Sequence, residues 1–132
     1  MNRMAYNQYK HNWEIVTSAS FDAWLLEQTE DDKAVIRFKI YLLSMYGPNL
    51  GRPHADTLKG SKKLSNLKEL RAKTDEHEFR VAYIFDPERK GLILTGGDKK
   101  GNNQRKFYKD LIREAEQIYA DYLEKKINRK ET

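Results

Sequence analysis

Cysteine is absent from the 132 residues of the chain. A disulfide framework, thiolate catalysis and thiolate-bound metal are therefore excluded. The three histidines (His11, His54 and His77) lie far apart and have no carboxylates at metal-ligand spacing, so we expect no metal site. The GxSxG, P-loop and dinucleotide-binding motifs are also missing, and we expect no cofactor.

Long apolar segments are absent as well. No run approaches the roughly 18 residues that a membrane-spanning helix requires, and the first residues, MNRMAYNQYKHNWE, contain no apolar signal segment. We therefore expect a cytoplasmic protein that does not contact a membrane. The length predicts one domain, and 39% hydrophobic residues, with 2 Trp, 8 Tyr and 5 Phe, suffice for a compact core.

Acidic residues are scarce where basic residues are dense. The net charge is +5, yet residues 1–34 carry more acids than bases, so the positive surplus lies later in the chain. Between Lys59 and Lys73 the only acid among many cations is Glu69. A basic face of this kind favours a polyanion, because binding to phosphates releases their counterions. A solvated lysine-rich surface is an equally open interpretation of the charge.

The apolar spacing in the first third predicts a strand at 13–17 and two helices. Ser20 is the expected N-cap of a helix on which Phe21, Trp24, Leu25 and Gln28 share one face. Thr29 opens a second helix as a capping box, and Gly47-Pro48 ends it. The stripe of this helix that covers the sheet is expected to be Val35, Phe38, Leu42 and Met45, widened by Ile36, Ile40 and Leu43.

The segment 57–101 predicts three strands joined by tight turns, after an extended loop at 49–55. The first of these strands ends at Arg71. Residues 78–86 alternate with period two, so Phe79 and Val81 face one side of the sheet and Arg80 faces the other. Residues 86–91 form a turn with an early proline and a late glycine. The last strand, 92–94, is expected to end at Gly96-Gly97.

A last helix is expected over about residues 103–126. The element order is then β-α-α-β-β-β-α, which is an α+β fold. One small, mostly antiparallel sheet packs on two helices, and its other face is left to the C-terminal helix and to solvent. We expect an N-terminal extension at 1–12, a folded domain at 13–126 and a charged tail at 127–132.

Cations and hydroxyls are the groups left for chemistry. Arg71 ends one strand, Arg80 lies on its neighbour, and Lys99 follows the last strand. Such groups converging on a sheet face suit a phosphate, because arginine binds two oxygens at once and lysine supplies a point charge. They could also cleave RNA, by stabilising the charge that develops when a 2′-hydroxyl attacks the adjacent phosphate. Candidate proton donors and acceptors are His54, Tyr108, a lysine of lowered pKa or a carboxylate such as Asp98.

Plain structural roles stay open for the same residues. Arg71 can pair with Glu69 or Glu78. His54 can fix its proline-containing loop, and Tyr108 can be a core aromatic with a solvated hydroxyl. The residue pattern by itself therefore indicates a polyanion-binding domain that could be a nuclease.

Three longer motifs stand out: GPNLGRPHADTLKGSKKLSNLKELRA (47–72), FRVAYIFDPERKGLIL (79–94) and GGDKKGNNQRKFYKDLI (96–112). They closely resemble a phage-related group, described as HigB-like, within the RelE/ParE toxin superfamily. The resemblance extends over about residues 13–123. It departs from the group at Lys100, where threonine is common, and at Lys106, which is inserted into an Arg-Phe-Tyr element.

The resemblance implies a RelE-like fold and the toxin of a type II toxin–antitoxin system. Such toxins are typically metal-independent endoribonucleases that cut mRNA on the ribosome (mRNA interferases) and so inhibit translation. The implied partners are a cognate helix-turn-helix antitoxin, the ribosome and mRNA, and operator DNA indirectly through the antitoxin. Two alternatives stay open: a non-enzymatic ParE-type inhibitor of DNA gyrase, and an inactive relative that only binds its antitoxin and modulates transcription.

The resemblance also implies roles for five residues. Arg71 and Arg80 are expected to clamp the phosphate, and Lys99 to stabilise the transition state. Tyr108 is expected to orient the nucleophile or leaving group, and His54 to act as the base. The expected RNA-binding residues are Lys59, Lys62, Lys63, Lys68, Lys100 and Arg105.

Overall fold

The computed structural model describes residues 2–3 and 13–131, and the side chains of residues 13–126. Its strands are β1 (Asn2–Arg3), β2 (Ile15–Thr17), β3 (Ala55–Thr57), β4 (Lys68–Lys73), β5 (Glu78–Phe85) and β6 (Gly91–Asp98). Its helices are α1 (Ala19–Leu26), α2 (Glu30–Tyr46), the short 3₁₀ helix η2 (Gly47–Asn49) and α3 (Gln104–Glu131). None of the described helices combines the length and apolarity that crossing a bilayer demands.

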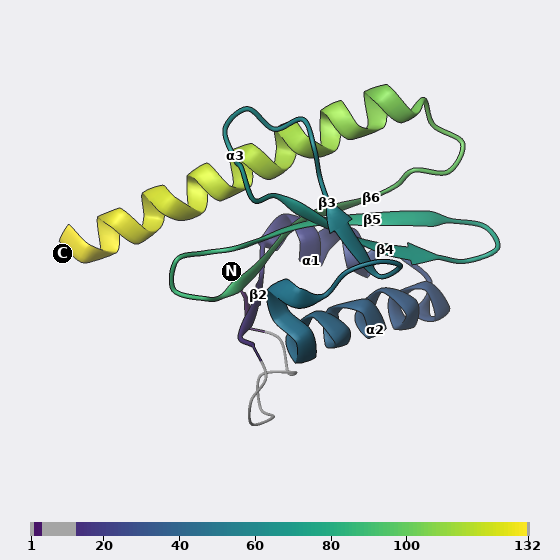
Figure 1. Cartoon of the computed structure of the whole chain (residues 1–132), viewed down its shortest axis with the longest axis horizontal. Coiled ribbons are helices and arrows are strands. Elements are labelled where there is room, and N and C mark those ends of the chain that lie inside the picture. Colours follow the sequence, from purple (N-terminus) through teal and green to yellow (C-terminus); the bar gives the residue numbers. More distant parts are fainter. Residues whose placement is uncertain (1, 4–12, 132) are drawn as a thin grey trace.

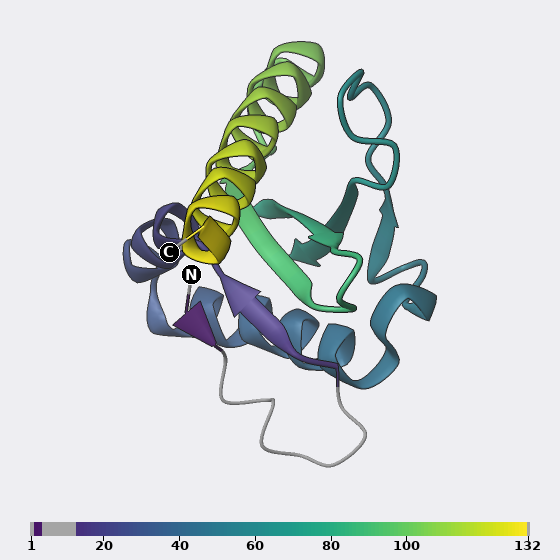
Figure 2. The same cartoon turned by 90° about the vertical axis from the view of Figure 1, so that its left-hand side faces the viewer.

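The strands form one sheet in the order β1-β2-β6-β5-β4-β3. Neighbouring strands are antiparallel except β2 and β6, which are parallel. Helices α1 and α2 cover one face of the sheet, and α3 crosses the other (Figures 1 and 2). The α+β class and the RelE-like arrangement expected from the sequence are confirmed.

Two short edge strands lie where the sequence predicted none. β1 falls in the expected N-terminal extension, whose residues 1 and 4–12 lie outside the described residues, and it pairs with β2. β3 begins at Ala55, the last residue of the segment expected to be an extended loop, and pairs with β4. Strands of two or three residues are too short to show period-two alternation, so only their pairing reveals them.

The strand β6 runs through the two glycines at which it was expected to end. A Cβ atom at Gly96 would lie 2.6 Å from the Trp24 ring, and one at Gly97 would lie 3.0 Å from the Phe107 ring. Glycine within a strand marks close approach of another group to the backbone. Here α1 and α3 approach the same strand from opposite faces, so Gly96 and Gly97 are packing positions.

Both N-terminal helices differ from prediction in one respect. Ser18, not Ser20, caps α1, because its side chain accepts from Phe21 N at 2.9 Å. Thr29 caps α2 as predicted, and α2 ends before Gly47. However, the buried face of α2 carries Ile36, Ile40 and Leu43, whereas the predicted stripe includes Phe38, 54% exposed, and Met45, 43% exposed. Both stripes have helical spacing, so spacing could not decide which one faces the sheet.

The last helix is longer than predicted. It continues to Glu131, through most of the expected charged tail at 127–132. No glycine or proline follows residue 101, and the residues after Lys125 are mainly good helix formers.

The sheet separates two hydrophobic cores. Between the sheet and α1/α2 lie Phe21, Ile36, Ile40, Leu43, Phe79, Val81 and Tyr83. Between the sheet and α3 lie Leu67, Ala82, Ile84, Leu92, Leu111 and Ala115. The alternation of β5 therefore places Arg80 on the α3 face, as its parity predicted.

We expect Gly96→Ala to lower the free energy of unfolding by about 1–3 kcal/mol, because the added methyl group would overlap the Trp24 ring. Urea unfolding followed by circular dichroism measures the change. Gly51→Ala is the matched control, because a Cβ atom there would meet only Asn49 O at 4.0 Å. Equal stability of the two variants would contradict this account of β6.

Candidate functional site

The pairing of β4 with β5 places two arginines opposite each other. Arg71 is the direct cross-strand partner of Arg80. Leu70 and Ala72, which flank Arg71, are buried in the core beneath α1 and α2. Because side chains alternate along a strand, Arg71 and Glu69 must lie on the α3 face, where Arg80 also lies.

Glu69 is buried beneath these two arginines, with 3% of its surface exposed. Its Oε2 accepts a hydrogen bond from Arg71 Nε at 3.1 Å, and its Oε1 lies 3.7 Å from Arg80 Nε. Arg80 is itself only 7% exposed. A buried carboxylate is tolerated when cations and hydrogen bonds compensate for lost hydration, and both guanidinium groups do so here.

Tyr108 joins this group from the first turns of α3. Its hydroxyl accepts a hydrogen bond from Arg80 Nε at 3.2 Å, and Arg80 Nη1 donates to the Phe79 carbonyl at 3.0 Å. Burial raises the pKa of Tyr108, the Arg80 hydrogen bond lowers it, and the nearby charge of Glu69 raises it again, with a net increase. The phenol is therefore protonated at neutral pH and can donate its proton.

Lys99 closes the group at the end of β6. Its Nζ lies 3.9 Å from Glu78 Oε2 and 5.8 Å from the centroid of the Tyr108 ring. The same Glu78 oxygen lies 3.9 Å from Arg80 Nη2. Four of the five residues expected to be catalytic thus meet in one place.

These four residues and the two glutamates that contact them form what we call the arginine–tyrosine cluster. Its members are Glu69, Arg71, Glu78, Arg80, Lys99 and Tyr108.

His54, the fifth expected catalytic residue, faces elsewhere. Its Nδ1 lies 2.8 Å from Nζ of Lys39 on α2, which covers the opposite face of the sheet. Burial and the positive charge of Lys39 lower the pKa of His54. Only the backbone carbonyl of His54 reaches towards the cluster, accepting from Arg71 N at 2.8 Å.

In the sequence, Glu69 was the one acid in a basic run and a possible partner of Arg71, and the structure shows that pair. Its spacing of two residues from Arg71 already placed both on one strand face. What the sequence did not show was that Arg80 would lie opposite them, since register depends on the tertiary fold.

Asp98, considered as a proton donor or acceptor, is bound to His77. His77 Nδ1 lies 2.6 Å from Asp98 Oδ2, and its Nε2 lies 3.5 Å from Asp32 Oδ2 on α2. The hydrogen bond that His77 donates to Asp98 raises the pKa of His77, burial opposes this rise, and the acidic neighbours raise the pKa further. His77 therefore links the first turn of α2 to the end of β6.

The expected RNA-binding residues separate into two groups. Lys62, Lys63 and Arg105 line one groove between the segment 58–67 and α3. Lys68 Nζ instead donates to the Pro48 carbonyl at 3.0 Å, and Lys100 Nζ donates to the Asp75 carbonyl at 2.5 Å. Lys59 is exposed in the same segment as Lys62 and Lys63.

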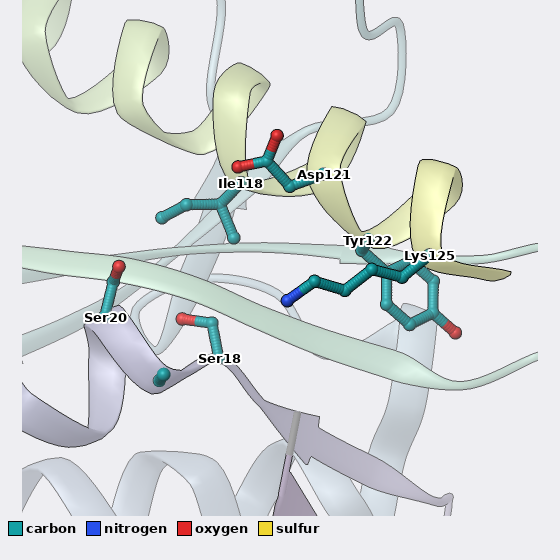
Figure 3. Close-up of a pocket in the computed structure, with 7 residues that line it drawn as sticks. Ser18, Ser20, Ile118, Asp121, Tyr122 and Lys125 are labelled. Atoms are coloured by element: carbon teal, nitrogen blue, oxygen red, sulfur yellow. The ribbon is translucent and has the colours of Figure 1, made fainter. Parts of the chain in front are cut away.

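A separate pocket lies between the start of α1 and the second half of α3, with a volume of about 170 Å³. Figure 3 shows the Lys125 side chain extending towards the serine side chains at the start of α1. None of the residues expected to be catalytic or RNA-binding lines this pocket, which is lined by Ser18, Ala19, Ser20, Ile118, Asp121, Tyr122 and Lys125.

Comparison with known proteins matches the chain to one family and to two relatives. The family model described as "Phage derived protein Gp49-like (DUF891)" matches residues 23–120, which include the whole cluster. "Putative toxin HigB3" of Mycobacterium tuberculosis (strain ATCC 25618 / H37Rv) is 35% identical over 109 residues, 83% of this chain and 92% of that protein. "Putative toxin HigB2" of the same strain is 33% identical over 102 residues, 76% of this chain. The match covers 50% of HigB2, so this chain spans about half its length.

We expect the His77 link to make stability depend on pH. Because the pKa of folded His77 is raised above its usual 6.5, its contribution is complete below pH 6.5 and is lost as the pH rises through the raised value. His77→Gln should flatten the fall in unfolding free energy between about pH 6 and 8. Chemical denaturation at several pH values measures the unfolding free energy of the wild type and the variant. His54 is present in both proteins, so its titration cancels in the difference. Identical pH profiles would contradict the link.

Proposed function

The chain belongs to the Gp49-like family of phage-derived proteins, a RelE/HigB-type toxin family, and we propose that it is an endoribonuclease that cuts mRNA. As the toxin of a toxin–antitoxin system, it has an antitoxin as its partner. The proposal adds that the arginine–tyrosine cluster holds and cleaves an RNA phosphate. The observation that carries it is the placement of Arg71, Arg80 and the Tyr108 hydroxyl on one sheet face.

Arg71 and Arg80 are the proposed phosphate-binding residues. Their guanidinium groups already hold a carboxylate, that of Glu69, at 3.1 and 3.7 Å. A phosphate presents oxygens of similar geometry and more charge, so it can be bound by the outer N–H groups of the same arginines. The side chain of Arg71 is 33% exposed, which leaves it accessible to a ligand.

The proposed reaction is attack of the RNA 2′-hydroxyl on the neighbouring phosphorus. The bond from phosphorus to the 5′-oxygen breaks, leaving a 2′,3′-cyclic phosphate and a 5′-hydroxyl end. Arg71, Arg80 and Lys99 stabilise the negative charge that develops on the phosphorane. Tyr108, whose phenol is protonated at neutral pH, donates its proton to the departing 5′-oxygen.

Glu69 is the proposed acceptor of the 2′-hydroxyl proton. Its Oε1 is buried at the centre of the cluster, 3.7 Å from Arg80 Nε, and has no hydrogen-bond partner among the described residues, so its lone pairs are not engaged in a hydrogen bond. We prefer Glu69 to His54 for this role, because the His54 imidazole faces Lys39 on the other side of the sheet.

The proposed setting is the ribosome, with mRNA as the substrate and operator DNA reached only through the antitoxin. The other cations on the α3 face would dock on RNA.

Metabolic labelling after induction tests this setting: incorporation of amino acids should fall first, with cuts in mRNA. Early loss of DNA synthesis with intact mRNA would contradict the proposal and indicate a gyrase inhibitor. Loss of neither would indicate an antitoxin-binding regulator.

We expect Tyr108→Phe to slow mRNA cleavage by about 10²- to 10⁴-fold, because it removes the proton donor and keeps the ring that packs edge-on against Phe107. Arg80→Ala should slow cleavage by about 10²- to 10³-fold through lost charge stabilisation. Cleavage is measured in a translation extract by primer extension. Circular dichroism and antitoxin binding control for folding. Full activity of both folded variants would place the reaction outside the cluster.

The base assignment is tested by two glutamine variants. Glu69→Gln should slow cleavage by about 10²- to 10⁴-fold, whereas His54→Gln should change it less than about threefold. The pH dependence of the cleavage rate is measured for both. Loss of activity in His54→Gln with activity retained in Glu69→Gln would restore His54, as the sequence suggested, and reject Glu69.

A further inference from the structure

A basic groove with a volume of about 760 Å³ lies between the segment 58–67 and the first half of α3. Figure 2 shows that segment and α3 rising from the same face of the sheet. Five cations and one acid line the groove. The lining residues are Gly60, Lys62, Lys63, Arg105, Lys109, Ile112, Arg113 and Glu116.

The charge of the groove is only partly balanced by the protein: Asp110, next to Lys109 in α3, lies in the field of Lys109 and Arg113. The acid, Glu116, accepts a hydrogen bond from Ser61 Oγ at 2.7 Å. None of the five cations forms an ion pair with a carboxylate in the part of the chain that the structure describes. Unpaired cations on two facing elements produce a positive potential that attracts a polyanion.

The two walls of the groove are held together before any ligand arrives. Ser61 Oγ, besides donating to Glu116, accepts from Leu64 N at 2.9 Å, which folds the segment onto itself. Gly60 has a φ of +112° and approaches Ile112, whose Cδ1 would lie 3.4 Å from a Cβ atom at that position. The cations are therefore presented by a fixed frame, which lowers the entropy lost on binding.

We propose that this groove binds the sugar–phosphate backbone of the single-stranded RNA whose scissile phosphate enters the arginine–tyrosine cluster. Tyr108 lies between Arg105 and Lys109 in α3, so the groove and the cluster adjoin along one helix. Among the described residues that line the groove none is aromatic, so these residues offer charges for phosphates and no platform for bases. The groove therefore holds RNA of any sequence. This inference rests on the proposed function and adds Lys109 and Arg113 to the RNA-binding residues.

The binding test uses a fluorescein-labelled 20-nucleotide 2′-O-methyl RNA, which lacks the attacking hydroxyl and cannot be cleaved. Fluorescence anisotropy gives its Kd at several salt concentrations. The triple variant Lys62→Ala, Lys109→Ala, Arg113→Ala should bind about 10- to 100-fold more weakly at ~0.1 M salt. The magnitude of its slope of log K against log salt should be smaller by about 2. Each lost phosphate contact lowers that magnitude by about 0.7 for a single strand, and the variant loses three contacts.

The matched control removes three exposed cations elsewhere: Arg37→Ala, Arg52→Ala and Lys125→Ala. It makes the same change in net charge and should keep the wild-type slope. The probe cannot be cleaved, so the wild type and the variants are compared on binding alone. Binding is thus measured independently of cleavage: absence of cleavage in every protein would reject the proposed function and leave this readout intact.

Three outcomes would overturn the groove assignment. The first is an unchanged slope and affinity in the triple groove variant. The second is equal displacement of the RNA by polyglutamate of the same charge concentration, which would assign the groove to an acidic peptide. The third is a triple groove variant that binds the 20-mer as the wild type does but no longer cosediments with empty ribosomes. That result would assign the groove to ribosomal RNA.

Discussion

The carboxylate of Glu69 is the group on which the α3 face of the sheet depends. Two arginines directly opposite each other on neighbouring strands repel, and such pairs destabilise a sheet. Glu69, on the same face as both, lies within 3.1 Å of one guanidinium and 3.7 Å of the other. The arginines in turn compensate the carboxylate for its lost hydration. Each charge is tolerated only because the others are present, so the three residues act as one unit.

The sheet divides stability and chemistry between its faces. The core under α1 and α2 contains most of the large buried side chains, including Phe21, Phe79 and Tyr83. The smaller core under α3 leaves one end of the sheet to charged groups. The second half of α3 is anchored by Tyr122, whose hydroxyl donates to Asp86 at 3.4 Å, and by a salt bridge from Lys126 to Glu88. This anchoring holds Tyr108, at the other end of the same helix, over Arg80.

Prediction from sequence succeeded where local pattern and burial agree. Period-two alternation correctly predicted that Arg80 lies on the opposite face of β5 from Phe79 and Val81. The N-cap at Thr29 correctly predicted the start of α2. Prediction was wrong where two patterns competed. Helix α2 carries two apolar stripes, and the sheet buries the one through Ile36 and Ile40 while Phe38 stays exposed. The two consecutive glycines of β6 are typical of a strand end, but the strand continues through them, because the rings of Trp24 and Phe107 pack directly against their backbone.

The sequence by itself determined the types of the longer elements, the two faces of β5 and the concentration of cations after residue 57, because these depend on local spacing and composition. It also determined the family, through motifs that span most of the chain. Only the tertiary structure decided which charges meet. The register of β4 and β5 makes Arg71 and Arg80 direct cross-strand partners. The path of α3 brings the Tyr108 hydroxyl within hydrogen-bond distance of Arg80. The loop beside β3 turned His54 to Lys39. Contacts between residues distant in the chain depend on the packing of whole elements, which no local pattern encodes.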